Sequence, residues 1–290
     1  LKPSEAQALA ERSVWRVGAV RGLPLLNDVD ARGSHAGIAA DYTEQVVRRL
    51  GVAAELVPFD SVSAMLEALR GGAIDVVPFL TRTAARAREF AYSAPYFEMP
   101  YVLVGRSDGP LYWDLASLDG HRLALALAHP LRELVAERYP GIRVLDPRDG
   151  NEAMDMVARG DADAAVEVKL FANLRINADT AGRLRALGEV GELPAQFHFA
   201  TSRAAAPLVP LIDRALADIP PAERERMLRR WVAIDLQPPF PWRRWLPTLL
   251  VGGLGLAALV GATLWWNRRL AQEVRQRRRA DQRLEDIGRT

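Results

Sequence analysis

The sequence predicts an α/β protein of two similar halves, followed by one membrane-spanning helix and a charged helix. Strand-like and helix-like segments alternate over the first 237 residues, as they do in layered α/β domains. Residues 246–266 contain no charged side chain. At 1.5 Å per residue they would span roughly 31 Å, the thickness of the hydrocarbon core of a bilayer.

The first half shows the alternation expected of a buried sheet flanked by helices. Apolar, β-rich runs predict strands, and apolar stripes at helical spacing predict helices. We expect strands at 14–20, 54–58, 74–80 and 101–104, and helices at 37–50 and 61–70. Residues 105–110 follow the last of these strands and are interpreted as a crossing between the two halves.

The pattern then starts again in the second half. We expect strands at 121–128, 142–145, 162–168 and 197–201, the last of which returns to the first half. The helices are expected at 131–139, 151–159, 207–216 and 223–232. Three prolines within residues 238–245 then predict a short, stiff connector.

The composition removes several classes of site. The chain has no cysteine, so disulfides, thiolate nucleophiles and cysteine metal sites are excluded. Its four histidines are scattered without ligand spacing, so we expect no metal and no cofactor. The 38 basic and 36 acidic residues nearly balance, so we expect no nucleic-acid partner.

Tryptophans and arginines around residues 246–266 support a membrane span and give its direction. Tryptophans flank both ends, as in interfacial aromatic belts. Arginines are far more numerous after the span than before it, so the positive-inside rule places 267–290 in the cytoplasm and 1–245 on the outer side of the membrane. An export signal or an earlier span is then expected upstream of Leu1.

The span and the helix after it bear on assembly. Gly253, Ala257 and Gly261 place a small residue at every fourth position, which allows two helices to approach closely and favours a homodimer. Small residues are also common in membrane helices of any kind, so the pattern leaves a monomer open. Residues 267–290 predict a charged relay helix whose heptads are poor for a coiled coil.

Seven short motifs follow one another along residues 14–236. They are Arg16–Ala19, Gly37–Tyr42, Arg49–Val52, Leu69–Val76, Thr83–Arg86, Tyr92–Tyr96 and Gly160–Ala164. In this order they resemble the landmarks of the extracellular solute-binding proteins of family 3, the polar-amino-acid type. The resemblance implies a two-lobed periplasmic-binding-protein-like domain, a type II Venus flytrap, over 14–237. Lobe 1 would comprise about 14–104 and 198–237, and lobe 2 about 105–197.

The two ends of the chain give a narrower resemblance. Leu1–Glu5, with Leu9 and Ala10, is similar to the linker that precedes the flytrap in BvgS-type sensor histidine kinases, although Ala8 stands where that linker usually has Trp. Residues 1–13 would then join an upstream segment. Residues 277–284 resemble the helix that enters a PAS domain. The resemblance implies a two-component sensor kinase of a bacterial inner membrane, with 1–245 in the periplasm, that signals to a response regulator. No kinase motif and no enzyme are expected within these 290 residues.

The resemblance also implies a ligand site in the cleft between the lobes. Arg86 matches the arginine that binds a ligand carboxylate through two hydrogen bonds; the alternative is an ordinary surface arginine. Thr81 and Thr83 lie on the same strand-to-helix turn, where hydroxyl and free N–H groups can hold an anion. Glu167 stands where relatives place an acid that faces a ligand ammonium group; a solvated strand-end glutamate is the alternative.

Two further positions bear on the ligand. Relatives often carry an aromatic residue after the first strand, whereas this chain has Leu23–Leu26; Phe79 or Tyr96 could replace it, or belong to the core. His129 follows a second-lobe strand and would titrate near neutral pH if it faced the cleft; an ordinary loop histidine is the favoured alternative. A cation and an anion across the cleft suit a small anionic or zwitterionic ligand, an amino acid or a carboxylate.

The favoured prediction is periplasmic small-molecule sensing by a membrane-proximal flytrap that signals across the membrane. Two rivals keep the flytrap: a membrane-tethered binding protein of a transporter, and the sensor part of a diguanylate cyclase. A third is an exported hydrolase. Gly105–Gly109 spells the nucleophile-elbow pattern around Ser107, but Pro110 follows it and no helical pattern does.

Overall fold

The computed structural model describes residues 3–232 together with Trp265 and Trp266. Residues 1–237 form one compact unit and residues 238–290 a second. In the second unit, Trp265 and Trp266 are helical and exposed. The rest of the predicted span, the proline connector and the charged helix lie outside the described residues. Among the residues that are described, no helix is both long enough and apolar enough to cross a bilayer.

The compact unit is built on one mixed sheet with the strand order β4-β1-β5-β11-β7-β10-β8-β9, and β6 pairs with β11. A two-stranded ribbon, β2 with β3, stands apart from it. The strands are β1 (Val14–Val20), β2 (Asp28–Val29), β3 (His35–Ala36), β4 (Ala53–Phe59), β5 (Val76–Thr81), β6 (Phe90–Tyr92), β7 (Phe97–Arg106), β8 (Arg122–Ala124), β9 (Arg143–Leu145), β10 (Ala164–Val168) and β11 (Leu184–Ser202).

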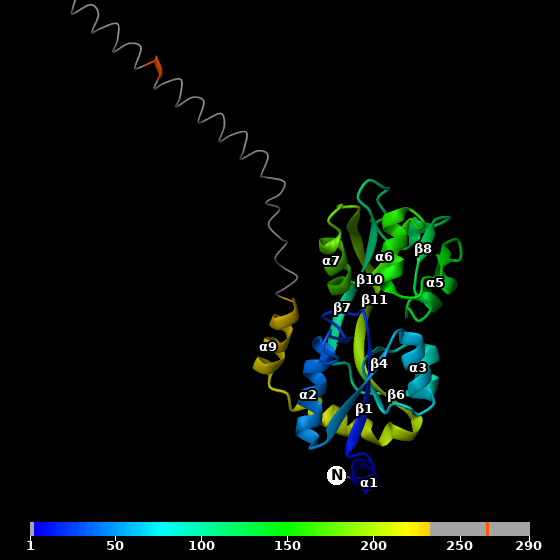
Figure 1. Ribbon diagram of the computed structural model, residues 1–290. Coiled ribbons are helices and arrows are strands. Elements are labelled where there is room, and N and C mark those ends of the chain that lie inside the picture. Colours follow the sequence, from blue (N-terminus) through cyan, green and yellow to red (C-terminus); the bar gives the residue numbers. More distant parts are fainter. Residues whose placement is uncertain (1–2, 233–264, 267–290) are drawn as a thin grey trace, which may run out of the picture. The chain divides into compact units, whose positions relative to one another are not determined.

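Two long strands, β7 and β11, run through both lobes (Figure 1). Phe197 of β11 lies opposite Thr81 of β5 in lobe 1. Further along, β11 follows β7 as far as Arg106, and Gly105 of β7 pairs with β10 in lobe 2. The prediction that residues 105–110 cross between the lobes was therefore wrong. They finish β7 and turn, with the N–H of Gly109 donating to the carbonyl of Arg106.

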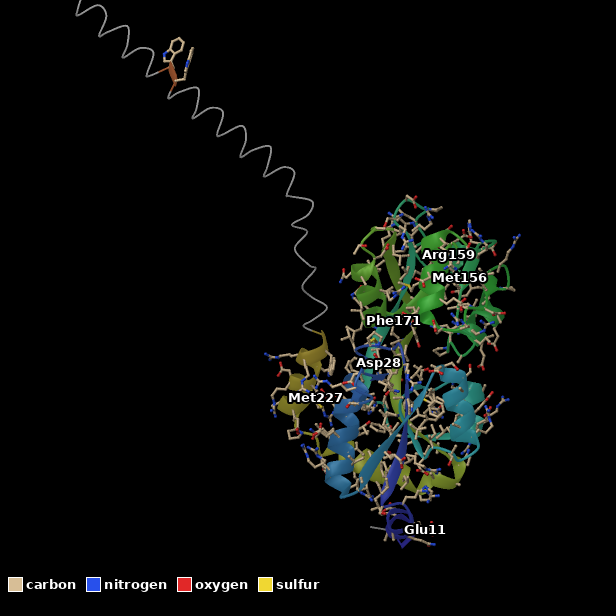
Figure 2. All side chains as sticks on the ribbon, viewed as in Figure 1. Glu11, Asp28, Met156, Arg159, Phe171 and Met227 are labelled. Atoms are coloured by element: carbon tan, nitrogen blue, oxygen red, sulfur yellow. The ribbon has the colours of Figure 1, made fainter. Side chains whose placement is uncertain are left out.

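Helices cover both faces of this sheet (Figure 1). They are α1 (Pro3–Glu11), α2 (Ile38–Leu50), α3 (Val62–Arg70), α4 (Ala84–Glu89), α5 (Arg132–Arg138), α6 (Gly150–Arg159), α7 (Lys169–Ala178), α8 (Val209–Ala217) and α9 (Pro221–Val232). Most bounds agree with the prediction to within a few residues. Figure 2 shows buried Phe171 of α7 in lobe 2 and Met227 of α9 against lobe 1.

Three helices, α1, α4 and α7, had no predicted range, although the turn before α4 was expected to lead into a helix. Tertiary contacts explain α1. Helix α1 falls within the predicted linker, yet it packs on lobe 1. Its Glu5 is 2% exposed and accepts a 2.7 Å hydrogen bond from Arg214 of α8. A paired carboxylate at this depth fixes the helix in place. Helix α7 buries Leu170 and Phe171 in lobe 2, but its apolar residues are too few for a clear period.

The Gly-x-x-Asp motifs perform the same structural task in both lobes. In lobe 1, Asp75 accepts hydrogen bonds from the backbone N–H and the Nε of Arg16, at 2.9 and 3.0 Å. In lobe 2, Asp163 accepts the equivalent pair from Arg122, at 2.8 and 3.2 Å. Each aspartate thereby fixes the start of a neighbouring strand. These landmarks of the sequence are therefore scaffold, and they leave the cleft to other residues.

Helix α2 begins against the loop that follows β1. The N–H groups of Ile38 and Ala39 donate to the carbonyls of Leu25 and Leu26, both at 2.9 Å. This close approach requires glycine at position 37, where φ is 102° and a Cβ atom would lie 2.6 Å from the Leu26 oxygen. Leu25 itself has φ of 66°, an uncommon conformation for a residue with a side chain.

We therefore expect Gly37→Ala to lower the free energy of unfolding by clearly more than the about 1–2 kcal/mol that a left-handed backbone alone costs an alanine, because the methyl group strains φ and also collides with the Leu26 carbonyl. Gly51→Ala is the matched control. Gly51 caps α2 at φ 67° with open space around its Cβ position, so it should lose only about 1–2 kcal/mol. Urea unfolding of both variants makes the comparison, and equal losses would contradict the close contact.

Candidate functional site: the cleft between the lobes

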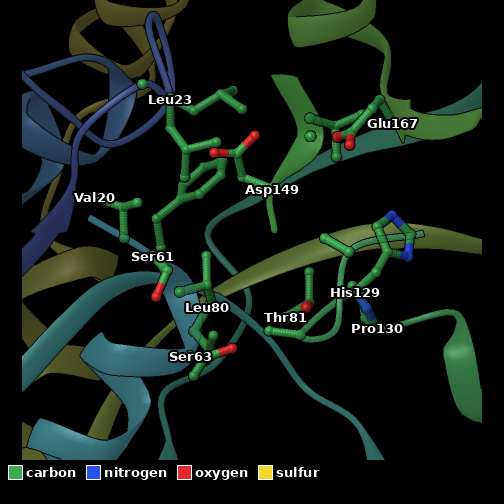
Figure 3. A pocket seen from close by; sticks show the side chains of 18 of the residues that line it. Val20, Leu23, Ser61, Ser63, Leu80, Thr81, His129, Pro130, Asp149 and Glu167 are labelled. Atoms are coloured by element: carbon green, nitrogen blue, oxygen red, sulfur yellow. The ribbon is translucent and has the colours of Figure 1, made fainter. Parts of the chain in front are cut away.

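A cavity lies between the lobes, beyond the carboxyl ends of β1, β5 and β10 (Figure 3). This is the usual position of a ligand in open α/β sheets. The space open to the centre of a water-sized molecule is about 140 Å³. Since one water needs only about 10–15 Å³ by this measure, the cavity is large enough for a small organic molecule.

Lobe 1 supplies an apolar wall. Val20, Leu26 and Leu80 are buried there, and Phe79 stacks on Phe197 with 3.6 Å between ring centroids. The structure thus places Phe79 on the cavity. Tyr96, the other aromatic candidate, lies in the core: its hydroxyl donates to the Pro78 carbonyl, and its ring packs on Tyr42.

Arg86 lies at the cavity, but its guanidinium donates to protein oxygens. Nη1 donates to the carbonyl and to the hydroxyl of Thr81, at 3.1 and 3.0 Å. Nη2 donates to the carbonyl of Ala128 in lobe 2. Burial lowers the pKa of Arg86, although a guanidinium keeps its charge in proteins. In this structure Arg86 therefore holds the two lobes together across the cleft.

The two threonines have different surroundings. Thr81 lines the cavity beside Arg86. Thr83 faces the grooves next to it, and its hydroxyl accepts the backbone N–H of Arg86 at 3.3 Å as the N-cap of α4. The groups predicted to hold an anion at this turn therefore already bond to one another. The guanidinium of Arg86 donates to Thr81, and the Thr83 hydroxyl accepts the backbone N–H of Arg86.

His129 lies in a loop and lines the cavity, and its pKa lies well below neutral. Burial lowers its pKa to about 3, with Arg86 and Arg132 adding to the effect. Its Nδ1 accepts the N–H of Leu131 at 3.2 Å, which places the proton of the neutral ring on Nε2. The predicted strand 121–128 ends early, at Ala124; residues 126–130 leave the sheet and form this side of the cavity.

Glu167 is a buried carboxyl group without a partner among the described residues. It lies near the end of β10 and is 9% exposed. No described residue donates a hydrogen bond to it or forms an ion pair with it, and burial, followed by the charge of Asp149, raises its pKa to about 8. Figure 3 shows both carboxyl groups on the lobe 2 side of the cavity.

Asp149 is a cleft residue that sequence reasoning missed. It is the N-cap of α6 and accepts the N–H of Glu152 at 2.9 Å through Oδ1. The sequence signal was available, because Asp149 and Glu152 have the spacing of a helix-capping box. That signal predicts a helix start, however, and says nothing about the second carboxylate oxygen, which is left for the cavity.

Ser107 has none of the surroundings of a nucleophile. It lies in the turn after β7, and its backbone N–H donates to the Arg183 carbonyl at 2.7 Å. It does not line the cleft cavity. The next helical segment along the described chain is the short turn Ala116–Leu118, so the strand-to-helix elbow that the motif requires is not formed.

The raised pKa of Glu167 predicts how stability depends on pH. The folded chain holds the Glu167 proton up to about pH 8, whereas the unfolded chain releases it near 4.5. Stability should therefore fall as pH rises between these values, by an amount on the order of 4 kcal/mol. Glu167→Gln should remove this fall, so that the variant is the more stable form at pH 8–9 and the two forms converge near pH 4.5.

Urea unfolding at pH 5, 7 and 9 measures this difference. Glu189→Gln is the control, because Glu189 is exposed and pairs with Lys169 at 2.8 Å. Parallel curves for wild type and Glu167→Gln would show that Glu167 is ionised in the folded protein.

Known proteins resemble both this sequence and this fold. Virulence sensor protein BvgS of Bordetella pertussis is 30% identical over 286 residues, covering 97% of this chain and 23% of that protein. Sensor protein EvgS of Escherichia coli K12 is 24% identical over 258 residues, covering 88% of this chain and 21% of that protein. The chain therefore spans less than a quarter of the length of these relatives.

Solved structures confirm the two-lobed fold. The crystal structure of the periplasmic VFT2 domain of B. pertussis BvgS matches with a TM-score of 0.72 and 30% identity, over 78% of this chain and 97% of that one. A mutant ArgBP from T. maritima matches with a TM-score of 0.69 over 79% and 99%, and at 24% identity it supports the fold alone. Residues 15–234 match the model of one family. The chain belongs to the bacterial extracellular solute-binding proteins, family 3.

Proposed function

We propose that this chain is the periplasmic sensing part of a BvgS-type sensor histidine kinase, and that a small ligand in the cleft changes the signal it sends. The observation that carries the proposal is a series of hydrogen bonds that leads from lobe 2, through the loop at the rim of the cleft and through α2, to α9. Helix α9 is the last described element before the predicted membrane segment. In a binding protein that only delivers a solute, the cleft needs no connection to this helix.

The first step of this path links lobe 2 to the rim of the cleft. Asn151 of α6 donates from Nδ2 to the Gly22 carbonyl at 3.0 Å. Gly22 begins the loop after β1, and Leu23 and Leu26 of the same loop line the cavity. A movement of lobe 2, or a ligand that fills the cavity, therefore acts on this loop directly.

The second step links the loop to α2. The carbonyls of Leu25 and Leu26 accept the N–H groups of Ile38 and Ala39 at the start of the helix. The positive φ of Leu25 marks a conformation that the surrounding contacts must maintain. A change in the loop should therefore be transmitted to the first turn of α2.

The third step links α2 to α9, which lies beside it (Figure 1). Asp41, in the first turn of α2, accepts hydrogen bonds from Arg230 at 3.0 Å and from the indole N–H of Trp231 at 2.8 Å. At the other end of α2, Arg49 donates to Glu223 of α9 at 3.1 Å. Helix α9 is therefore attached to α2 near both of its ends.

The remaining parts of the proposal rest on the sequence. Residues 246–266 would cross the inner membrane as a homodimer, with 1–245 periplasmic and 267–290 leading into a PAS and kinase region that signals to a response regulator. A ligand shifts the lobe equilibrium only by its differential affinity for the two arrangements. The connection between α2 and α9 would carry that shift to the membrane.

Hydrogen–deuterium exchange on the 290-residue chain tests this path. Asn151→Ala removes the contact between lobe 2 and the rim, so we expect exchange to become several-fold faster in residues 223–232, while β10 stays protected. Arg159→Ala is the matched control, because Arg159 lies on the same helix and pairs with Asp161 at the surface. If Asn151→Ala leaves exchange in α9 unchanged, the cleft is not coupled to that helix.

A further inference from the structure

We propose that the cleft selects a small organic cation, an amine or guanidinium with an apolar body, and that it does not bind a ligand carboxylate through Arg86. The inference rests on the proposed sensing function and names the ligand class of the same cavity. It departs from the zwitterion or anion that the sequence predicted. Three features carry it. The arginines in the lining already pair with oxygens of the protein, two carboxyl groups have oxygens without a described partner, and the opposite wall is apolar.

The arginines that line the cavity are each engaged by the protein. Arg86 bridges Thr81 and Ala128. Arg21 donates to Asp60 at 2.7 Å, and Arg148 donates to Glu152 at 3.0 Å. Lys169, the lysine among the described residues, does not line the cavity. Within the described lining, an entering carboxylate would therefore have to compete with the carbonyl or carboxylate oxygen that each guanidinium already pairs with.

The carboxyl groups in the lining, unlike the arginines, have oxygens without partners. Glu167 is only 9% exposed, lines the cavity and has no partner among the described residues. Asp149 uses one carboxylate oxygen for the Glu152 N–H, and its side chain accepts no hydrogen bond from any other described residue. An unpaired buried carboxyl group is unfavourable, and an ammonium or guanidinium group would supply both the charge and the donors that these oxygens lack.

The remaining walls fit the body of such a ligand. Val20, Leu23, Leu26, Leu80 and the stacked pair Phe79–Phe197 form the apolar side. A short alkyl or aryl chain would bury apolar surface there, while its charged end meets the carboxyl groups. Ligand sites of this size commonly combine apolar walls with a few placed polar groups.

Cation binding should displace the proton of Glu167 into solvent. The groups that face Glu167 are Asp149 and Arg148 from the start of α6, His129 from the loop after β8, Tyr101 from β7, and Arg86 across the cleft. The arginines stay charged, and His129 is neutral because its pKa is about 3. With the pKa of Glu167 at about 8, affinity for a permanent cation should rise with pH between 6 and 8, by at most about tenfold per unit.

The test uses ligand pairs that differ only in a carboxylate: arginine and agmatine, lysine and cadaverine, phenylalanine and phenethylamine. Calorimetry and thermal melting of the 290-residue chain at pH 6, 7 and 8 compare the members of each pair, with succinate and glutamate as anions. We expect at least one amine to bind at least tenfold more tightly than its amino acid. An amino acid or succinate that binds while the amines do not would overturn the inference and leave the sensing function standing.

Variants then assign the site. Glu167→Gln and Asp149→Asn should each weaken amine binding at least tenfold, and Glu167→Gln should also remove the pH dependence; asparagine remains a good N-cap, so α6 is kept. Asp161→Asn, an exposed lobe 2 carboxylate paired with Arg159, should change nothing. Amine binding that survives both cleft variants would overturn the inference. Absence of any binding by the whole panel would overturn the proposed sensing function as well.

Discussion

The bridge that Arg86 makes between the lobes is the contact on which the rest of the cleft depends. One guanidinium joins Thr81, at the end of a lobe 1 strand, to the Ala128 carbonyl of lobe 2. A carbonyl oxygen accepts a hydrogen bond as a carboxylate oxygen does, but it carries no net charge. The protein therefore holds its own lobes together through the arginine that the sequence resemblance predicted would bind a ligand carboxylate. The contact that Arg86 makes between the lobes needs no anion.

The lobe 2 side of the cleft carries two carboxyl groups that pair with no cationic side chain among the described residues. Burying Glu167 beside Asp149 disfavours the ionised carboxylate, because burial removes hydration and the neighbouring charge repels it. At neutral pH Glu167 avoids the unfavourable free energy of ionisation by keeping its proton. A cation that replaced this proton would form with Glu167 the ion pair that no described residue provides.

Much of the fold could be predicted from the sequence, because its motifs describe local scaffold. Asp75 and Asp163 fix strand starts in both lobes, and such turns have short, readable patterns. The sequence pattern also predicted the position of Arg86. It could not predict the partner of Arg86, because Ala128 contributes a backbone carbonyl, which any residue could provide. The pKa of His129 and the open carboxyl of Glu167 depend on burial, and burial arises from residues distant in the sequence. Helix α1 was missed for the same reason, since Arg214 stabilises it.

The attachment of α1 and α9 to lobe 1 determines which lobe can move. Helix α1 is fixed through Glu5 and Arg214, and α9 through Asp41 and Glu223. Lobe 2 is joined to lobe 1 by β7 and β11 and by contacts across the cleft, such as those of Arg86 and Asn151. Of the two lobes, lobe 2 is thus the one that can move without moving α1 or α9. A ligand that binds the lobe 2 carboxyl groups acts on the mobile lobe, and the loop at Gly22 and Leu25 is where that movement first meets the element that holds α9.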